Sequence, residues 1–281
     1  MTRDMAMLLD GKALAARVRA KVKDRIQSQH LNPGLAILLV GTDPASHTYV
    51  QKKQEACAEA GIHFEKFLYP EFVRDDELIS KIQELNKRAD IHGILVQLPL
   101  PAGHDTDKII AEIDPKKDVD GFHPENLERL KNGKPAMVSA VALAVMKLIG
   151  ETRGGSAVIV SSDLFASPLV ILLKEKNILS TVVHLDALDA EKTKAADILI
   201  VAAGKPNLIT ADHVKPGSIV IDVGTTKVDG KLLGDVDHTS VKPIAGALTP
   251  VPGGVGPMTV AMLLVNVLKA CTLQSTKMPN D

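Results

Sequence analysis

The sequence predicts an α/β protein of two domains, each built around a parallel β-sheet. Short apolar runs that suit buried strands alternate with longer stretches of helical periodicity, and this alternation is typical of βαβ units. The chain has 281 residues, of which 45% are hydrophobic, enough for two domains of ordinary size. Residues 114–126 are rich in turn formers and charge, and we interpret them as the crossing between the domains.

The first domain is expected over residues 1–120. A helix should begin at Asp10 or Gly11, where apolar residues take up helical spacing. We then expect strands at 35–40, 63–68 and 91–99, alternating with helices at 46–61, 78–89 and 105–113. Ser46 is a good N-cap for the first of these alternating helices, and Gly61 should end it.

The second domain is expected over residues 138–257, as a doubly wound, Rossmann-type sheet. Its strands are predicted at 157–160, 181–185, 198–202 and 218–223, with helices at 138–149 and 168–176. A final apolar helix follows at about 260–273.

Composition argues against several classes of function. The formal net charge is -1 and aromatic residues make up 2%, so neither a basic nucleic-acid surface nor a stacking platform is expected. The N-terminus does not resemble a signal peptide, and we expect no apolar run long enough to span a bilayer. Cys57 and Cys271 are too few for a disulfide framework, so a cytoplasmic protein with reduced thiols is expected, and no metal site.

A candidate site begins just after the first strand of the first domain. Tyr49 and Lys53 are four residues apart and therefore share one face of the helix that follows this strand. Ligands of open α/β sheets bind beyond the carboxyl ends of the strands, where this helix starts. The alternative is an amphipathic helix with Lys52 and Lys53 in water.

Three further features have both a functional and a structural interpretation. Gln97 interrupts an apolar strand, where its amide is either a site residue or a satisfied core amide. Asp120 is a candidate ligand or an ordinary turn residue. The glycine-rich loop that contains Pro252, Gly253 and Gly254 either lets the backbone approach a ligand or closes a domain.

Four motifs, in order and over nearly the whole chain, carry a resemblance to a known family. They are Tyr49-Val-x-x-Lys53, Val96-Gln97-Leu98-Pro99-Leu100-Pro101, Lys117-Asp118-Val119-Asp120-Gly121-Phe122-His123-Pro124 and Thr249-Pro250-Val251-Pro252-Gly253-Gly254-Val255-Gly256-Pro257-Met258-Thr259. Together they resemble the bifunctional methylenetetrahydrofolate dehydrogenase/methenyltetrahydrofolate cyclohydrolase family, called FolD in bacteria. The segments 202–206 and 221–224 extend the match.

The resemblance implies a folate substrate in a cleft between the two domains, a first domain completed by the C-terminal helix 258–274, and a homodimer. It implies that Lys53 is the catalytic lysine, that Gln97 modulates it, and that Tyr49 positions the reacting carbon. Asp120 would bind the polar edge of the pterin, and Pro252, Gly253 and Gly254 would also contact the substrate. NADP or NAD would be the cofactor.

The chain departs from the family at the dinucleotide loop, residues 160–168. Both glycines and the basic residue of the family pattern are replaced, and Val160 and Ala166 stand at the two glycine positions. Candidate cofactor residues are Ser162, Asp163, Asp186, Ala203 and Gly204. Asp186 follows the second strand, where an acid binds a ribose 2′-hydroxyl and would favour NAD; alternatively it is a solvent-facing residue.

The predicted function is therefore folate one-carbon interconversion, with three alternatives. One is a cyclohydrolase whose dehydrogenase activity is weakened or lost, because the altered loop would obstruct the dinucleotide. Another is a non-catalytic folate-binding or scaffolding relative. The last is a Rossmann oxidoreductase acting on another substrate.

Overall fold

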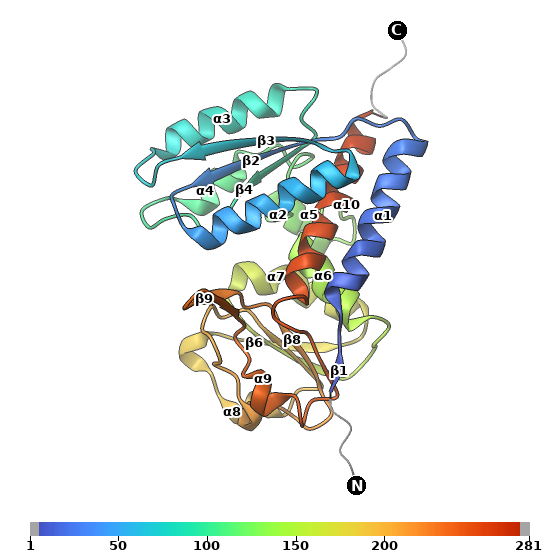
Figure 1. The fold of residues 1–281 in the computed structure, drawn as a ribbon, viewed down its shortest axis with the longest axis vertical. Helices are drawn as coiled ribbons and strands as arrows, with labels where there is room; N and C mark the ends of the chain where they lie inside the picture. Colours follow the sequence, from blue (N-terminus) through green and yellow to red (C-terminus); the bar gives the residue numbers. More distant parts are fainter. Residues whose placement is uncertain (1–5, 276–281) are drawn as a thin grey trace. The chain divides into compact units, whose positions relative to one another are not determined.

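The computed structural model describes residues 6–275, which form two compact units (Figure 1). One contains residues 16–140 and those from 260 onward, and we call it the three-stranded unit after its sheet. The other contains residues up to 15 and residues 141–259, and we call it the six-stranded unit. The predicted two-domain α/β class is confirmed.

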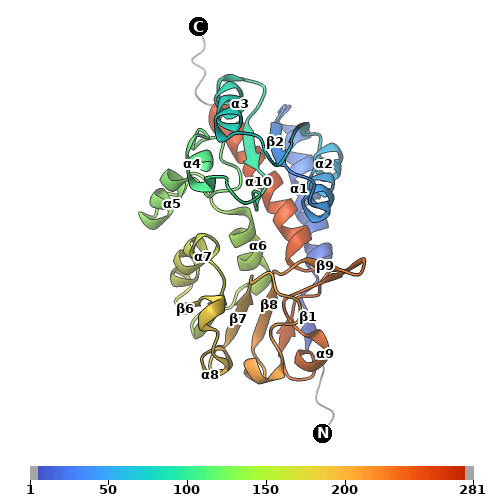
Figure 2. The same cartoon turned by 90° about the vertical axis from the view of Figure 1, so that its left-hand side faces the viewer.

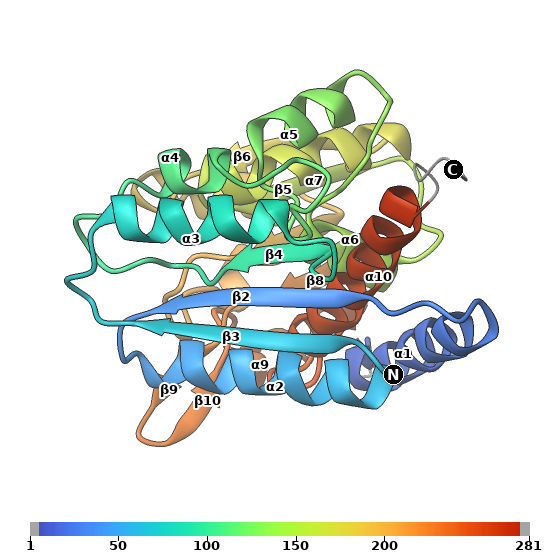
Figure 3. The same cartoon turned by 90° about the horizontal axis from the view of Figure 1, so that it is seen from above.

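The sheet of the three-stranded unit is fully parallel, in the order β3-β2-β4. Its central strand, β2 (Gly34–Val40), is buried along its whole length, as its unbroken apolar sequence requires. β3 (His63–Tyr69) and β4 (Gly93–Val96) flank it. Helices α2 (Pro44–Ala60) and α3 (Asp75–Lys87) cover opposite faces of this sheet (Figure 3).

Helix α2 begins two residues before the predicted N-cap. Its N-cap is Asp43, whose carboxylate accepts a hydrogen bond from the backbone N–H of Ser46 at 2.8 Å, so the assignment of Ser46 as N-cap was wrong. Pro44 takes the first helical position, where its missing N–H costs nothing. Gly61 ends the helix in the left-handed conformation, as expected.

The stretch 114–126 is not a crossing between the units. It lies within the three-stranded unit, where Asp118 forms an isolated parallel bridge with Ile94 of β4. It follows α4 (Thr106–Ala111) and leads into α5 (Pro124–Lys131), a helix that the turn-rich sequence concealed. Turn-forming residues here build an ordered loop rather than a linker.

The six-stranded sheet is parallel and has the order β1-β11-β8-β7-β5-β6, which Figure 2 shows in part. Its strands are β1 (Met7–Leu8), β5 (Ser156–Val160), β6 (Leu179–Val183), β7 (Ile198–Val201), β8 (Ile219–Asp222) and β11 (Ala247–Leu248). The helices of this unit are α7 (Asp163–Glu175), α8 (Ala190–Lys194) and α9 (His238–Val241), with single 3₁₀ turns η1 (Leu185–Ala187) and η2 (Ala211–His213). An antiparallel hairpin, β9 (Thr226–Val228) and β10 (Lys231–Leu233), completes it.

The boundaries of the units differ from the expected domains at two places. Met7 and Leu8 pair with β11, so the first described residues belong to the six-stranded unit and not to the expected first domain. Residues 121–140 belong to the three-stranded unit. The chain passes between the three-stranded and the six-stranded unit within three helices. These are α1 (Gly11–Ser28), α6 (Ala140–Ile149) and α10 (Val255–Ser275).

Helix α10 contradicts the expectation that no apolar run is long enough to span a bilayer. Its 21 residues meet that criterion by length and composition. In the structure, 67% of its most apolar window is buried among protein side chains, which accounts for its composition as that of a core helix.

Candidate functional site

Three predicted site residues of the three-stranded unit meet around one amine. Lys53 is only 3% exposed, and its Nζ donates a hydrogen bond to Oε1 of Gln97 at 2.9 Å. The same Nζ lies 4.7 Å from the ring centroid of Tyr49. The alternative of a solvated Lys53 is therefore wrong.

Local structure explains this meeting. Tyr49 and Lys53 stand one helical turn apart on α2, and α2 starts beyond the carboxyl end of β2. Gln97 directly follows β4, and its N–H continues the sheet ladder to the carbonyl of Leu38 at 2.9 Å. Its side-chain Nε2 donates to the carbonyl of Leu98 at 2.6 Å, which turns Oε1 towards the amine. The amide is therefore fixed at both ends.

The burial of Lys53 alters its protonation. Removal from water lowers the pKa of Lys53 to about 8, because a buried ammonium loses its hydration, while the nearby charge of Asp120 acts in the opposite direction. Gln97 accepts a hydrogen bond without adding a negative charge that would stabilise the ammonium. The lowered pKa makes the neutral amine far more abundant at neutral pH than it is for a solvated lysine.

Asp120 is the acidic partner in this environment. Burial raises the pKa of its carboxyl to about 6, the positive charge of Lys53 lowers it, and Asp118 raises it. The side chain still keeps partial contact with solvent. A carboxyl with this pKa is mostly ionised at neutral pH and can accept hydrogen bonds from a ligand.

The loop that presents Asp120 is held by Asp118. One carboxylate oxygen of Asp118 accepts the N–H of Gly121 at 2.9 Å. The other accepts the N–H of His123 and the amide of Asn126, each at 2.9 Å. Gly121 is required because its φ is +80° and a Cβ there would lie 2.3 Å from the backbone nitrogen of Ser139.

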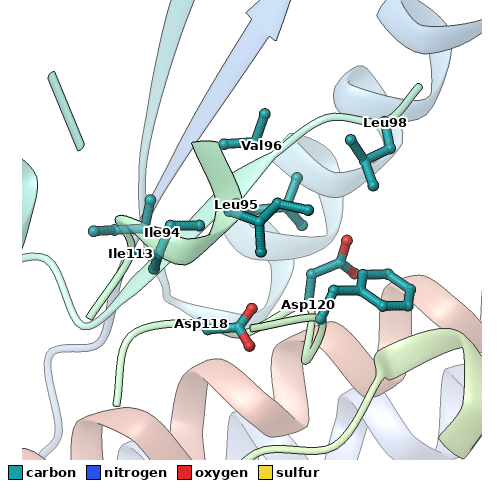
Figure 4. Close-up of a pocket in the computed structure, with 9 residues that line it drawn as sticks. Ile94, Leu95, Val96, Leu98, Ile113, Asp118 and Asp120 are labelled. Atoms are coloured by element: carbon teal, nitrogen blue, oxygen red, sulfur yellow. The ribbon is translucent and has the colours of Figure 1, made fainter. Parts of the chain in front are cut away.

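A small hollow adjoins this loop (Figure 4). Asp118 and Asp120 lie on the loop beneath β4, and mainly apolar side chains complete the wall. The lining residues are Ile94, Leu95, Val96, Leu98, Ile110, Ile113, Asp118, Asp120 and Phe122.

Asn266 of α10 is a residue of this region that the sequence interpretation missed. It is 2% exposed, and its Nδ2 donates to the carbonyls of Val119 at 2.9 Å and Val138 at 2.8 Å. These two contacts hold the loop on either side of Asp120. A single amide within an apolar helix was the available signal, the same one that identified Gln97.

The predicted cofactor residues all follow strands of the six-stranded sheet. Ser162 and Asp163 come after β5, Asp186 lies in η1 after β6, and Ala203 and Gly204 come after β7. Because β6, β5 and β7 are neighbours and parallel, these positions gather at the carboxyl ends of the strands, which we call the carboxyl edge of the sheet. Open α/β sheets bind ligands beyond these strand ends.

The two residues at the replaced glycine positions are packed inside the six-stranded unit. Val160 is the last residue of β5 and lies in the sheet core with 0% exposure, and Ala166 is buried on α7. Helix α7 begins at Asp163, five residues before the predicted start. The side chain of its N-cap, Ser162, makes no capping bond to the first N–H groups of α7.

Ala203 and Gly204 are held from within the protein. Their backbone N–H groups donate to Oδ2 of Asp235 at 2.6 and 3.0 Å, and the N–H of Asp235 donates to Asp222 at 2.9 Å. Burial raises the pKa of Asp235, whereas the two backbone N–H groups lower it. The loop after β7 is therefore shaped by two buried carboxyl groups that the sequence interpretation did not identify as site residues.

The predicted substrate loop lies in the six-stranded unit. Gly253 has φ +114°, and its carbonyl accepts the N–H of Lys12 at 2.8 Å. A Cβ on Gly11 would lie 1.9 Å from the carbonyl oxygen of Gly254, so the start of α1 packs closely on this loop. Pro252 is exposed. These residues are not in the same unit as Lys53, Gln97 and Asp120.

Comparison with known proteins yields consistent matches over the whole chain. Residues 9–120 match the family model of the tetrahydrofolate dehydrogenase/cyclohydrolase catalytic domain, and residues 136–275 match that of its NAD(P)-binding domain. The bifunctional protein FolD of Bordetella avium is 47% identical over 275 residues, 94% of this chain and 97% of that protein.

Solved structures of two proteins also match this chain over almost its full length. The bifunctional methylenetetrahydrofolate dehydrogenase/cyclohydrolase FolD of Campylobacter jejuni is 40% identical, with a TM-score of 0.88 over 95% of this chain and 99% of that one. The Trypanosoma brucei enzyme, solved with NADP cofactor and an inhibitor, is 34% identical, with a TM-score of 0.90 over 98% of this chain and 99% of that one.

Proposed function

Because the chain belongs to the tetrahydrofolate dehydrogenase/cyclohydrolase family, we propose that it is a bifunctional enzyme of folate one-carbon metabolism. It oxidises 5,10-methylenetetrahydrofolate to the 5,10-methenyl cation with NAD(P), and it hydrolyses that cation to 10-formyltetrahydrofolate. The observation that carries the proposal is the buried contact between Lys53 and Gln97, beside Asp120.

In the hydrolytic step, a water oxygen bonds to the methenyl carbon, the water loses a proton, and one C–N bond of the ring opens. We assign the proton transfer to Lys53. Its neutral amine accepts the proton of the attacking water, and the resulting ammonium can return it to the departing ring nitrogen. A lysine with its pKa near 8 serves both directions, whereas a solvated lysine would remain protonated.

Binding and orientation of the folate are assigned to Asp120 and Tyr49. An ionised carboxylate can accept hydrogen bonds from the amino and ring N–H groups at the polar edge of a pterin. The ring of Tyr49 stands beside the Lys53 amine and can hold the reacting carbon near it. Pro252, Gly253 and Gly254 are assigned to the substrate as well, on the motif alone.

The dehydrogenase half is assigned to the carboxyl edge of the six-stranded sheet. A nicotinamide dinucleotide held there would supply the acceptor for the hydride of the methylene carbon. The start of α7 would receive a phosphate, with Ser162 and Asp163 at that turn. Asp186, Ala203 and Gly204 complete the assigned cofactor residues, the last two through the loop that they shape.

The alternative functions have less support. Cyclohydrolase activity alone has less support, because residues 136–275 match the NAD(P)-binding domain of the family. A scaffold would not require a lysine with a lowered pKa. An oxidoreductase acting on another substrate would not require the folate motifs.

Assembly and location complete the proposal. A homodimer is supported by the family resemblance and by Leu179, an 81% exposed residue on the edge strand β6. A cytoplasmic location is supported by the two buried, free cysteines, Cys57 and Cys271.

The test uses the purified full chain. With 5,10-methylenetetrahydrofolate, methenyl absorbance and reduced dinucleotide should form when NAD or NADP is added. With 5,10-methenyltetrahydrofolate alone, absorbance should decay faster than in buffer. Absence of the first result would remove the dehydrogenase half, and absence of the second would remove the cyclohydrolase half.

A further inference from the structure

We propose that Asp186, together with Asp163, makes this chain prefer NAD to NADP by leaving no place for a 2′-phosphate. This inference rests on the proposed dehydrogenase function and adds the identity of its cofactor. NAD and NADP differ only in the group on the adenosine ribose, which is a 2′-hydroxyl in NAD and a 2′-phosphate in NADP. The charge around that position therefore decides between them.

The first observation is where Asp186 lies. β6 ends at Val183, and Asp186 is an exposed residue of the 3₁₀ turn that follows. β6 is the strand next to β5, and β5 feeds the phosphate-binding turn. In a Rossmann sheet, a carboxylate at the end of this second strand accepts a hydrogen bond from the ribose 2′-hydroxyl of NAD.

The second observation is that Asp163 adds a second negative charge nearby. It occupies the first turn of α7, and its side chain is 84% exposed. Its Oδ1 lies 3.4 Å from Nε2 of His184, the residue that follows β6, so the ends of β5 and β6 are in contact here. A 2′-phosphate carries about two negative charges at neutral pH and would be repelled by carboxylates near this position.

The third observation is the lack of an opposing cation on these segments. Residues 161–167 and 184–189 contain no lysine or arginine, and the latter hold Asp186 and Asp189. The next cation along the chain is Lys192 of α8, six residues beyond Asp186. Lys205 lies on the same edge but follows β7, two strands from β6, or roughly 10 Å at the usual strand spacing. Among the described residues of these two turns, only His184 can carry a positive charge, and it is paired with Asp163.

The test is direct binding of NAD and of NADP to the full chain by titration calorimetry. We expect NAD to bind at least tenfold more tightly at low salt. Added salt should narrow the difference, because it screens the repulsion of the 2′-phosphate more than the neutral hydroxyl contact. Equal or tighter binding of NADP would overturn the inference and leave the proposed function standing. Binding of neither would overturn it together with the dehydrogenase half.

Variants identify the residues responsible. Asp186→Asn should weaken NAD binding and improve NADP binding, reducing the NAD:NADP affinity ratio by roughly tenfold to hundredfold, the effect of one hydrogen bond to a charged group. Asp163→Asn should improve NADP binding by less, and the double variant should approach equal affinities.

The control is Asp212→Asn, an exposed aspartate of η2 that precedes β8 and therefore lies towards the other edge of the sheet. It should leave the affinity ratio unchanged. Thermal unfolding of each variant confirms folding before the ratio is interpreted. An unchanged ratio in folded Asp186→Asn would contradict the role of Asp186.

Discussion

The site around Lys53 and the carboxyl edge of the six-stranded sheet differ in how the protein prepares them. Lys53 and Gln97 are buried and bonded to each other, and the loop that carries Asp120 is fixed by Asp118. At the sheet edge, Ser162, Asp163 and Asp186 are exposed. Proton transfer at the Lys53 site depends on particular side chains. Binding of a dinucleotide at the carboxyl edge of the six-stranded sheet can depend on backbone N–H groups.

This difference explains which parts of the sequence can vary without loss of function. Replacing Lys53 would remove a proton acceptor that no backbone group can supply. Replacing a glycine by Val160 in a strand, or by Ala166 on a helix, changes side chains that the sheet and helix bury. A substitution in a motif that acts through its backbone groups therefore counts less against a proposed function than a substitution in a motif that acts through a side chain.

The largest effect is expected from Lys53→Met. Methenyl hydrolysis should fall by ~10²–10⁴-fold, the usual contribution of a general acid–base group, while folate binding is largely retained. The matched control is Lys52→Met, since Lys52 is the exposed neighbour on α2. Stopped-flow decay of methenyl absorbance measures both, and hydrolysis at the wild-type rate in Lys53→Met would refute the assignment.

Asp120→Ala should weaken folate binding by about 1.5–3 kcal/mol, because the pterin donors lose an ionised acceptor. The same variant should lower the pKa of Lys53, because the charge of Asp120 favours the ammonium. A larger fraction of the Lys53 amine should then be neutral at a given pH. Fluorescence titration with a folate measures the affinity. An unaltered dissociation constant would reduce Asp120 to a turn residue.

Asn266→Ala should have a smaller effect on the same binding. The carbonyls of Val119 and Val138 lose their donor, so the loop that carries Asp120 should loosen. We expect a KM for the folate several-fold higher, with roughly 1–3 kcal/mol of lost stability from two unsatisfied buried groups. Ser275→Ala, which removes only a bond within α10, is the control. A loss of stability without any change in KM would indicate a structural role alone.

A further prediction concerns stability and pH. The pKa of Lys53 is about 8 when folded and near 10.5 when unfolded, so the unfolded chain binds more protons between these values. Wild-type stability should therefore rise relative to Lys53→Met as pH increases from about 8 to 10.5. Urea unfolding at several pH values measures this difference, and parallel pH curves would show that Lys53 is not buried as an amine.

Much of the fold followed from the sequence because local patterns agreed with the final structure. The apolar run of β2 and the four-residue spacing of Tyr49 and Lys53 required no tertiary information. The helix α5 was missed, since its turn-rich sequence offers no long periodic pattern. The two hydrogen bonds from Asn266 were also not predicted, because they join residues more than one hundred positions apart.

The burial of Val160 is another feature that the sequence does not show by itself. Val160 ends β5, which pairs with both β6 and β7, and its side chain lies in the core. The place of β5 between two neighbouring strands is a property of the assembled sheet, so the sequence of one strand does not reveal it.

The central claim is that the neutral amine of Lys53 performs the hydrolysis, and the pH dependence of kcat/KM for methenyl hydrolysis tests it most directly, because kcat/KM reports the pKa of the free enzyme. After subtraction of the uncatalysed reaction, kcat/KM of the wild type should rise with pH through an apparent pKa near 8. Lys53→Met should lose this rise, and Lys52→Met should keep it. A kcat/KM independent of pH between about 6 and 9, or the same rise in Lys53→Met, would contradict the account.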